Sequence, residues 1–404
     1  MKTLAGKWVL LGVSGGIAAY RACELARLLI KDGATVQAVL TEAASRFVGP
    51  LTFQSLTGRP VEVGGGGTLS VSGMAHIDFG QQADLIAVAP ATANTLAKIA
   101  HGLADNLLTS TILASRCPLV LAPAMNTRMW DNSATQDNLA RLRSFSRVTL
   151  VGPDAGLLAC GETGQGRMAE PEVILEAIRA GVSKKDLVGK RIVVTAGPTR
   201  EFWDPVRYLT NRSSGRMGYG LAAAACHRGA EVVLISGPCS LRPPWGVRHV
   251  PVVSAQQMSQ AVFAEVPQAD AVLMAAAVAD FRPREVVSQK LKKGQGNLAF
   301  ELEPTQDILA SLGAQAHTCL LVGFAAETGN PVESAKKKLK SKQLDLVVAN
   351  DVSRPDAGFD VETNLVHLVT AWEVEELPLM SKAEASAQIL DRVVIMLQSQ
   401  GKKI

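Results

Sequence analysis

The 404-residue sequence has few aromatic side chains, little net charge and no long apolar run. Aromatic residues make up only 4% of the chain, which disfavours the base-stacking surfaces of single-strand nucleic-acid binders. The formal charge of +4 is modest for this length, so we expect local anion sites and no nucleic-acid partner. Apolar runs such as 271–279 are far shorter than the roughly 18 residues of a membrane span, so we expect no membrane partner.

Cysteine is also sparse, and its spacing excludes the usual cysteine frameworks. No C-x-x-C pair and no metal-ligand spacing occurs. The apolar start of the chain is interrupted at Ser14–Gly16 and Arg21, where a signal peptide would continue. We therefore expect a soluble, reduced, cytoplasmic protein. The six cysteines are Cys23, Cys117, Cys160, Cys226, Cys239 and Cys319.

Hydrophobic residues make up 47% and charged residues 19%, a balance typical of buried parallel sheets between helices. The length predicts two domains of about 180 to 220 residues each. A polar, charged segment at 181–190 predicts a boundary between domain 1–190 and domain 191–404.

In both halves apolar strands recur between helical stretches, a pattern that predicts an α/β fold with two doubly wound domains. The first domain has predicted helices at 17–32, 91–101, 105–115 and 129–142, and the second ends in a helix near 382–398. Predicted strands lie at 8–13, 35–40, 84–89, 118–122, 147–151, 191–196, 231–236, 248–253, 271–276, 319–323, 345–349 and 364–370.

Each half begins with a strand that runs into a small-residue turn and then a helix. The first turn is Gly12–Ile17, and the second combines Gly197–Thr199 with Asn211–Gly215. Small residues let backbone N–H groups approach a phosphate near a helix N-terminus, although a plain strand-to-helix turn also favours Gly and Ser. Neither turn matches the spaced-glycine dinucleotide fingerprint or the P-loop, which argues against tandem nicotinamide oxidoreductase domains.

Polar residues follow the first-half strands, at the sheet edge where open α/β sheets bind ligands. These segments are 89–95 and 122–130, and downstream lies the glycine-rich segment 159–168, which predicts a mobile lid loop. His76, Asn126 and Cys160 are the candidate catalysts. Each also has a structural interpretation: a surface histidine, a helix cap and a small buried hydrophobe.

Three basic clusters in the second half indicate a nucleoside triphosphate with a divalent metal. Arg207 accompanies the second turn, and Lys290–Lys293 follow the strand end at 279–283. A lysine run is more often a solvated helix face, yet this one follows the strand end at 323–328, where ligands bind. The run comprises Lys336, Lys337, Lys338, Lys340 and Lys342.

The first half resembles the flavin-dependent cysteine decarboxylase family through Ser14–Ala18, Pro90–Asn94, Pro123–Asn126 and Ala159–Glu162. The resemblance implies that His76 serves the flavin-dependent oxidation of a cysteinyl thiol and that Asn126 binds the substrate carboxylate. It also implies that Cys160 returns a proton to the enethiolate. The implied cofactor is FMN, held by Gly12, Ser14, Gly15, Gly16, Ile17, Thr41, Ala91, Thr92, Ala93, Asn94 and Thr95.

The second half resembles the phosphopantothenate–cysteine ligase family, and the fused order is that of the bacterial bifunctional family of coenzyme A biosynthesis. The resemblance implies a Mg²⁺-dependent reaction of CTP, 4′-phosphopantothenate and cysteine through an acyl-cytidylate. Asn211 would bind the acyl-cytidylate and Lys290 would neutralise charge. The implied CTP contacts are Met274, Ala275, Ala276, Asp280, Lys290, Thr305, Gln306, Asp307, Ile308, Phe324, Lys338 and Lys342.

The family pattern also implies a homo-oligomer with sites shared between subunits. Gln306 departs from the pattern, since a proline is expected there. An alternative of another class is a flavin-binding regulatory or scaffold protein of the same fold. The joint presence of His76, Asn126 and Cys160 favours catalysis over that alternative.

Overall fold

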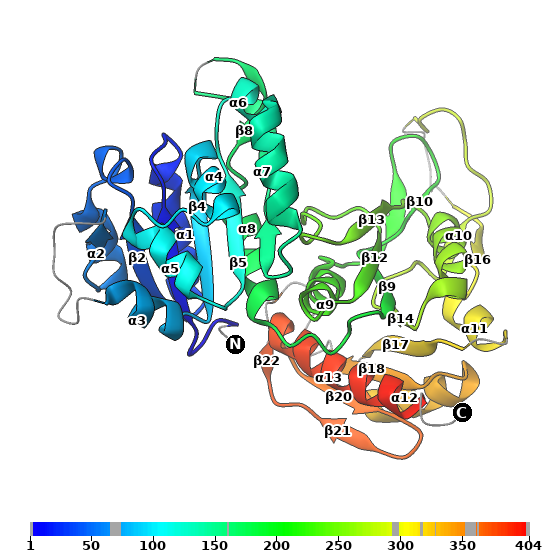
Figure 1. Ribbon diagram of the computed structural model, residues 1–404. Helices are drawn as coiled ribbons and strands as arrows, with labels where there is room; N and C mark the ends of the chain where they lie inside the picture. Colours follow the sequence, from blue (N-terminus) through cyan, green and yellow to red (C-terminus); the bar gives the residue numbers. More distant parts are fainter. Residues whose placement is uncertain are drawn as a thin grey trace. The chain divides into compact units, whose positions relative to one another are not determined.

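The chain forms two compact units, Met1–Ser183 and Lys184–Ile404, and each is described by itself (Figure 1). The division falls inside the polar segment 181–190. The computed structural model describes residues 3–64, 74–159, 161–292, 299–315, 318–327, 329–351, 361 and 363–400.

The first unit is built on a six-stranded parallel sheet with the order β3-β2-β1-β4-β5-β6. The chain starts in the middle at β1, moves outward to β3, and then returns to the other side of β1 at β4. This is the doubly wound order that the sequence predicts. The strands are β1 (Trp8–Val13), β2 (Thr35–Leu40), β3 (Glu62–Val63), β4 (Leu85–Ala91), β5 (Leu119–Pro123) and β6 (Val148–Leu150).

Helices cover both faces of this sheet (Figure 1). On one face α1, α2 and α8 contact one another or the strands, and on the other α4 packs on α5 and α7. The sheet is apolar because both faces are buried, and every residue of β4 is buried. The helical elements are α1 (Ala19–Lys31), η1 (Ala44–Arg46), α2 (Pro50–Thr57), α3 (Ala75–Gln82), α4 (Ala93–His101), α5 (Leu107–Ala114), α6 (Thr127–Asp131), α7 (Ser133–Arg143) and α8 (Pro171–Val182).

The glycine-rich segment 159–168, predicted as a mobile loop, belongs to a β-hairpin, so the prediction of a loop is wrong for Thr163–Arg167. Strand β7 (Asp154–Leu157) pairs antiparallel with β8 (Thr163–Arg167). The hairpin is held to the body of the unit by a hydrogen bond from Met125 N–H to Gly166 O (2.9 Å). A Cβ atom at Gly166 would lie 2.2 Å from Met125 O, so the glycine permits a close backbone approach and does not mark a hinge.

The second unit contains an eight-stranded sheet with the order β13-β12-β9-β14-β17-β18-β20-β21. Its first six strands are parallel and repeat the order of the first unit, which confirms the prediction of a second doubly wound domain. The last two strands are antiparallel. The strands are β9 (Arg191–Ala196), β12 (Glu231–Ser236), β13 (Arg248–Pro251), β14 (Ala271–Met274), β17 (Leu320–Glu327), β18 (Leu346–Asp351), β20 (Val366–Val369) and β21 (Val374–Glu376).

Strand β9 shows how this sheet is buried on both faces. Ile192 and Val194 pack into one core with α9 and α13, whereas Val193 packs into the other with α10 and α12. Successive side chains point to opposite faces, so a continuous apolar strand supplies both cores. The helical elements are α9 (Arg216–His227), α10 (Ala255–Glu265), η2 (Val266–Gln268), α11 (Ile308–Gly313), α12 (Pro331–Ser341) and α13 (Lys382–Gln400).

Three short antiparallel ribbons lie outside the large sheet of the second unit. One of them joins residues that are distant in sequence, because Asn364 pairs with Met380 and Thr363 with Ser381. The ribbons pair β10 (Arg200–Phe202) with β11 (Tyr208–Thr210), β15 (Phe281–Pro283) with β16 (Leu302–Pro304), and β19 (Thr363–Asn364) with β22 (Met380–Ser381).

We predict that Gly218→Ala destabilises the second unit. Gly218 is on α9, where a Cβ atom would lie 2.5 Å from Ala196 Cβ and 2.7 Å from Thr195 O, so α9 would have to move off β9. Overpacking of this kind costs about 1–3 kcal/mol. Urea denaturation should show a lower midpoint for this variant. Gly49→Ala is the matched control, since no atom of the described residues lies within 4 Å of its added Cβ; equal midpoints for the two variants would contradict the account.

Candidate functional site

The first unit has a pocket of about 1070 Å³ at the point where the strand order reverses. Its walls include the turn after β1 (Gly15–Ala18) and the residues that follow β4 (Thr92–Thr95). Adjacent parallel strands whose crossovers leave in opposite directions separate at their carboxyl ends, which is why open α/β sheets bind ligands there. Predicted site residues Gly15, Gly16, Ile17, Thr41, Thr92, Ala93, Asn94, Thr95 and Asn126 all line this pocket.

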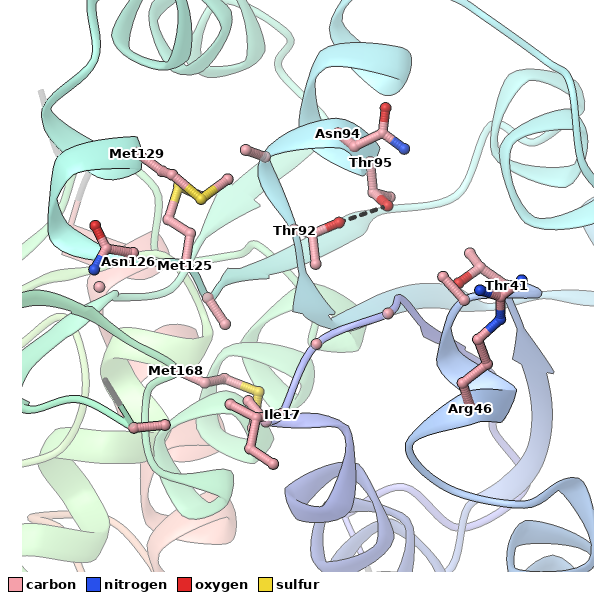
Figure 2. Close-up of a pocket in the computed structure, with 18 of the residues that line it drawn as sticks. Ile17, Thr41, Arg46, Thr92, Asn94, Thr95, Met125, Asn126, Met129 and Met168 are labelled. Atoms are coloured by element: carbon pink, nitrogen blue, oxygen red, sulfur yellow. Dashed lines mark hydrogen bonds between the residues drawn. The ribbon is translucent and has the colours of Figure 1, made fainter. Parts of the chain in front are cut away.

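One side of the pocket is polar and includes the N-terminus of α4 (Figure 2). The first N–H groups of a helix have no partner within the helix, and Thr92, the N-cap residue, makes no side-chain cap bond to α4. Thr92 and Thr95 instead share a hydrogen bond of 3.2 Å between their hydroxyls. Such a terminus favours an anionic group, as a phosphate is.

Another part of the wall is apolar. Met125, Met129 and Met168 line it together with Ile17 and Leu157, and Ile17 remains 61% exposed. Figure 2 shows Met125, Met129 and Asn126 grouped on one side of the pocket, with Thr41 and Arg46 on the other. A pocket with a polar helix terminus and an apolar wall fits a planar heterocycle that carries a phosphate, so the residues present fit a flavin mononucleotide.

Ser14 does not line the pocket but connects its two main walls. The buried Ser14 hydroxyl donates to Pro90 O (2.7 Å) and accepts from the Thr92 N–H (2.9 Å). Predicted residues Gly12 and Ala91 also lie outside the lining, in β1 and at the end of β4. A Cβ atom at Gly12 would meet Leu108, so this glycine makes room for packing.

Asn126 caps α6 and contacts the β7–β8 hairpin. Its Oδ1 accepts from the Arg128 N–H (2.8 Å), as its interpretation as a cap predicts, and its Nδ2 donates to Glu162 Oε2 (2.8 Å). Asn126 therefore caps a helix and also lines the pocket. His76 lies on α3, half-buried and outside the pocket lining. Cys160 lies outside the described residues.

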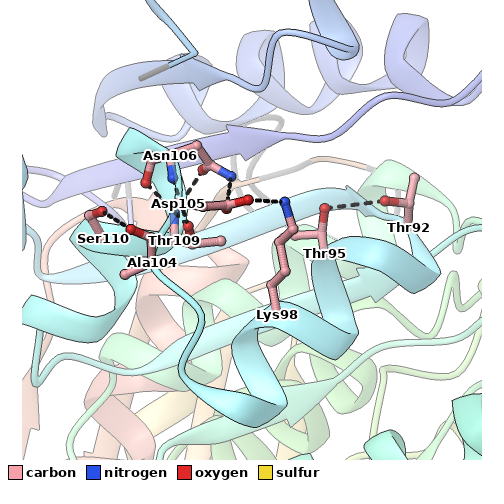
Figure 3. A network of polar contacts seen from close by, with 8 residues as sticks. All are labelled: Thr92, Thr95, Lys98, Ala104, Asp105, Asn106, Thr109 and Ser110. Carbon is pink, nitrogen blue, oxygen red and sulfur yellow. Dashed lines mark hydrogen bonds and ion pairs between the residues drawn. The ribbon is translucent and has the colours of Figure 1, made fainter. Parts of the chain in front are cut away.

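A polar network beside the pocket was not anticipated from the sequence (Figure 3). Lys98 donates to Asp105 (2.6 Å), and Asn106 donates to the other oxygen of that carboxylate (3.0 Å). The Lys98 ammonium is the main reason that the pKa of Asp105 lies below its usual value. All three side chains line the pocket. Other lining residues that the sequence did not indicate are Arg21, Arg46 and Leu157.

The second unit has a pocket of about 500 Å³ at its own strand-order reversal, between β9 and β14. Asn211–Gly218 and Met274–Asp280 line it. The predicted residues brought together there are Asn211, Met274, Ala275, Ala276, Asp280, Thr305, Gln306, Asp307, Ile308, Phe324, Lys338 and Lys342.

Two lysines of this pocket are paired with carboxylates. Lys338 contacts Glu327 (2.8 Å) and Lys342 contacts Asp307 (2.7 Å). Burial alone would raise the pKa of Asp307, but its ion pair with Lys342 and a hydrogen bond from a helix N–H outweigh burial and lower it. The same balance of burial against Lys338 lowers the pKa of Glu327. An anionic ligand would therefore meet lysines that the two carboxylates already orient.

Lys290 is exposed and does not line the second pocket. The next residue is anchored, because Leu291 N–H donates to Asp204 (3.3 Å) and Arg207 donates to Leu291 O (2.8 Å). Asp204 is fully buried. Burial alone would raise its pKa, but the Arg207 guanidinium and three backbone N–H groups hold the pKa far below the usual range. This turn thus fixes where the Lys290 segment leaves the domain.

Gln306, the departure from the family pattern, has a structural role. Its Oε1 accepts from the Ser259 hydroxyl (2.8 Å), and its Nε2 donates to Ser311 (3.3 Å). The side chain thereby links α10 to α11 at the edge of the pocket.

Two further findings concern only the residues that the structure describes. Among these residues, no group of three or more His, Cys, Asp or Glu side chains could hold a metal ion. No helix among them is sufficiently long and apolar to cross a bilayer.

The sheets and pockets define a tandem α/β protein with a pocket in each unit, and two family matches coincide with the two units. Residues 2–183 match the family described as Flavoprotein. Residues 187–396 match the family described as DNA/pantothenate metabolism flavoprotein C-terminal domain.

Relatives match over nearly the whole chain. The coenzyme A biosynthesis bifunctional protein CoaBC of Bacillus subtilis (strain 168) is 46% identical over 400 residues, with 98% of each chain covered. The protein of that name from Escherichia coli (strain K12) is 43% identical over 406 residues, covering 99% of this chain and 100% of the relative. A crystal structure of the C-terminal domain of CoaBC is 45% identical and covers 54% of this chain and all of that one, with a TM-score of 0.47.

This chain belongs to the family of bifunctional proteins of coenzyme A biosynthesis. Membership over the full length, with both halves present, disfavours the alternative of a flavin-binding regulatory or scaffold protein.

We predict that Ser14→Ala weakens flavin binding by the first unit. Loss of the hydroxyl leaves the Thr92 N–H without its partner, while Pro90 O keeps only the bond from the Ser14 backbone N–H (3.2 Å), so the link between the two walls of the pocket is weakened. A lost hydrogen bond of about 1 kcal/mol corresponds to a roughly fivefold higher Kd. Fluorescence titration of the flavin-free protein with FMN measures this. Ser45→Ala, which removes an exposed hydroxyl bonded to Glu42 O, is the control; an unchanged Kd for Ser14→Ala would refute the prediction.

Proposed function

We propose that the chain carries out two successive steps of coenzyme A biosynthesis, one in each unit. The second unit joins 4′-phosphopantothenate to cysteine with CTP as the source of activation, and the first unit decarboxylates the product to 4′-phosphopantetheine. The supporting observation is that most of the predicted site residues of each half line one pocket, which lies at a strand-order reversal. The domain assignments 1–190 and 191–404 follow from this proposal.

In the second unit we place the nucleotide across the lysine-lined side of the pocket. Lys338 and Lys342 supply charge toward the phosphates, and the small residues Ala275 and Ala276 leave room for the ligand. The substrate carboxylate attacks the α-phosphorus, pyrophosphate leaves, and the amine of cysteine then displaces CMP. Mg²⁺ would be bound mainly through phosphate oxygens, as it commonly is with nucleotides.

Asn211 is positioned to contact the activated intermediate. Its Nδ2 donates to Val278 O (2.9 Å) while the residue lines the pocket, so its side chain is already oriented. Oriented donors and cations that stabilise developing charge usually contribute most to the acceleration of such reactions. Lys290 would neutralise charge from the segment anchored at Leu291.

In the first unit the pocket would hold FMN, with the phosphate at the N-terminus of α4 and the ring against the methionine wall. FMN would supply oxidation of the cysteinyl thiol, which makes loss of carbon dioxide easier, and its reduced form would return the electron pair to the enethiolate. Asn126 would bind the substrate carboxylate, and Cys160 would return a proton to the enethiolate. His76, which lies on α3, would act in the oxidation step.

We further propose a cytoplasmic homo-oligomer with sites shared between subunits. His76 lies outside the lining of the first pocket of its own subunit. This placement supports shared sites, because His76 of a second subunit could then complete that pocket. Exposed apolar side chains beside the first pocket, Ile17 and Tyr20 among them, are consistent with a covered surface.

We predict that Asn211→Asp impairs ligation while decarboxylation survives. The carboxylate replaces an oriented amide and repels the negatively charged intermediate, so ligase turnover should fall by about 10²-fold, the scale for loss of one stabilising donor. Separate assays with 4′-phosphopantothenate and with synthetic 4′-phosphopantothenoylcysteine measure the two activities. Equal loss of both would indicate misfolding and would not support the assignment.

We predict that Cys160→Ser retains flavin and releases carbon dioxide but stalls before the final product. A serine hydroxyl is a much weaker acid than a thiol, so the last proton transfer should be slow. Mass spectrometry should show an oxidised, decarboxylated species that accumulates. Normal formation of 4′-phosphopantetheine by this variant would remove Cys160 from the mechanism.

A further inference from the structure

One corner of the second pocket contains none of the residues assigned to CTP. It consists of Asn350, Asn364 and Lys382, all of which line the pocket. Asn350 lies near the end of β18, where it pairs with Val366 of β20. Asn364 ends β19 and Lys382 begins α13 directly after β22, and these two short strands pair with each other. The β19–β22 ribbon brings Asn364 close to Lys382, and the β18–β20 pairing brings Asn350 to the same wall.

This corner contains polar atoms that are buried and not satisfied. Asn364 is only 3% exposed, and the Oδ1 atoms of Asn364 and Asn350 are buried without a hydrogen-bond partner among the residues that the structure describes. Buried acceptors without a donor are rare in folded proteins because leaving them unpaired is unfavourable. Two such atoms in the wall of one pocket indicate a ligand that brings donors to them.

Lys382 adds a positive charge to the same corner. The residue is 8% exposed and lines the pocket. An ammonium in so buried a position attracts an anionic group more strongly than an exposed one, because less water screens its charge. The corner therefore combines two acceptors with one cation within a single wall.

We propose that this corner binds the amino-acid substrate of the ligase. An α-amino acid carries an amine, whose N–H groups match the two Asn oxygens, and a carboxylate, which matches Lys382. The proposal rests on the ligase function proposed above and names the site of its third substrate. A phosphate group fits this corner less well, since it has no N–H donors for the two acceptors.

The arrangement also suits the reaction. A neutral amine that donates two N–H bonds to Asn350 and Asn364 keeps its lone pair available. The new bond joins the amine nitrogen to the acyl carbon, and the bond from that carbon to the phosphate oxygen breaks. The electron pair leaves with CMP, and the nitrogen releases one proton to water.

The test separates the two halves of the ligase reaction. Formation of the acyl-cytidylate needs no cysteine, so exchange of labelled pyrophosphate into CTP in the presence of 4′-phosphopantothenate reports on it alone. For Asn364→Leu we expect exchange within about twofold of the wild type and a KM for cysteine raised roughly tenfold, the effect of one strong hydrogen bond. Asn364→Asp keeps a hydrogen-bond acceptor, so its KM for cysteine should lie closer to that of the wild type.

A second variant tests the carboxylate contact through specificity. Wild-type protein should prefer cysteine over cysteamine, which lacks the carboxylate. In Lys382→Met the ratio of kcat/KM for cysteine to that for cysteamine should fall roughly tenfold, mainly through cysteine. Arg242→Met, which removes an exposed charge outside the pocket lining, should leave the ratio unchanged. A loss of stability alone would lower kcat/KM equally for cysteine and for cysteamine.

An unchanged KM for cysteine in Asn364→Leu would overturn the proposal, as would an unchanged specificity ratio in Lys382→Met. Parallel loss of exchange in Asn364→Leu would also overturn it, because the corner would then serve the nucleotide or the pantothenate. If wild-type protein shows no pyrophosphate exchange, the ligase function itself fails, and this result is distinct from the others.

Discussion

Both pockets depend on a buried hydroxyl that joins the two strands on either side of the strand-order reversal. In the first unit Ser14 accepts the Thr92 N–H. In the second unit Thr195 accepts the Ala276 N–H (3.1 Å) and Thr199 accepts the Ala279 N–H (3.0 Å). Crossovers that leave in opposite directions open a gap at this point. The hydroxyls limit how far it opens and fix the loops that carry the ligand-binding residues.

The shared construction explains how one chain supports two different chemistries. The sheet places two loops at each reversal, and the residues on those loops then decide what binds. In the first unit a methionine wall faces the N-terminus of α4, which suits a flavin. In the second unit charged lysines and the Asn350–Asn364–Lys382 corner surround a smaller pocket, which suits several polar substrates. Function therefore resides in loops carried by two sheets whose six parallel strands have the same order.

The sheets were predictable because each buried parallel strand is a continuous apolar run, as in 8–13 and 191–196. Motifs that follow those strands predicted most of the pocket lining. The β7–β8 hairpin was missed because glycine-rich sequence resembles a loop when the close backbone approach at Gly166 is not visible. The corner at Asn364 and Lys382 was missed because it depends on antiparallel pairing between short segments, which leaves no periodic pattern.

One chain that contains both units should perform both steps in sequence. The most direct measurement is mass spectrometry of the products formed by purified protein from 4′-phosphopantothenate, cysteine and Mg²⁺, with and without CTP. The account predicts 4′-phosphopantetheine only when CTP is present. Absence of product in both reactions, despite bound flavin, would contradict it.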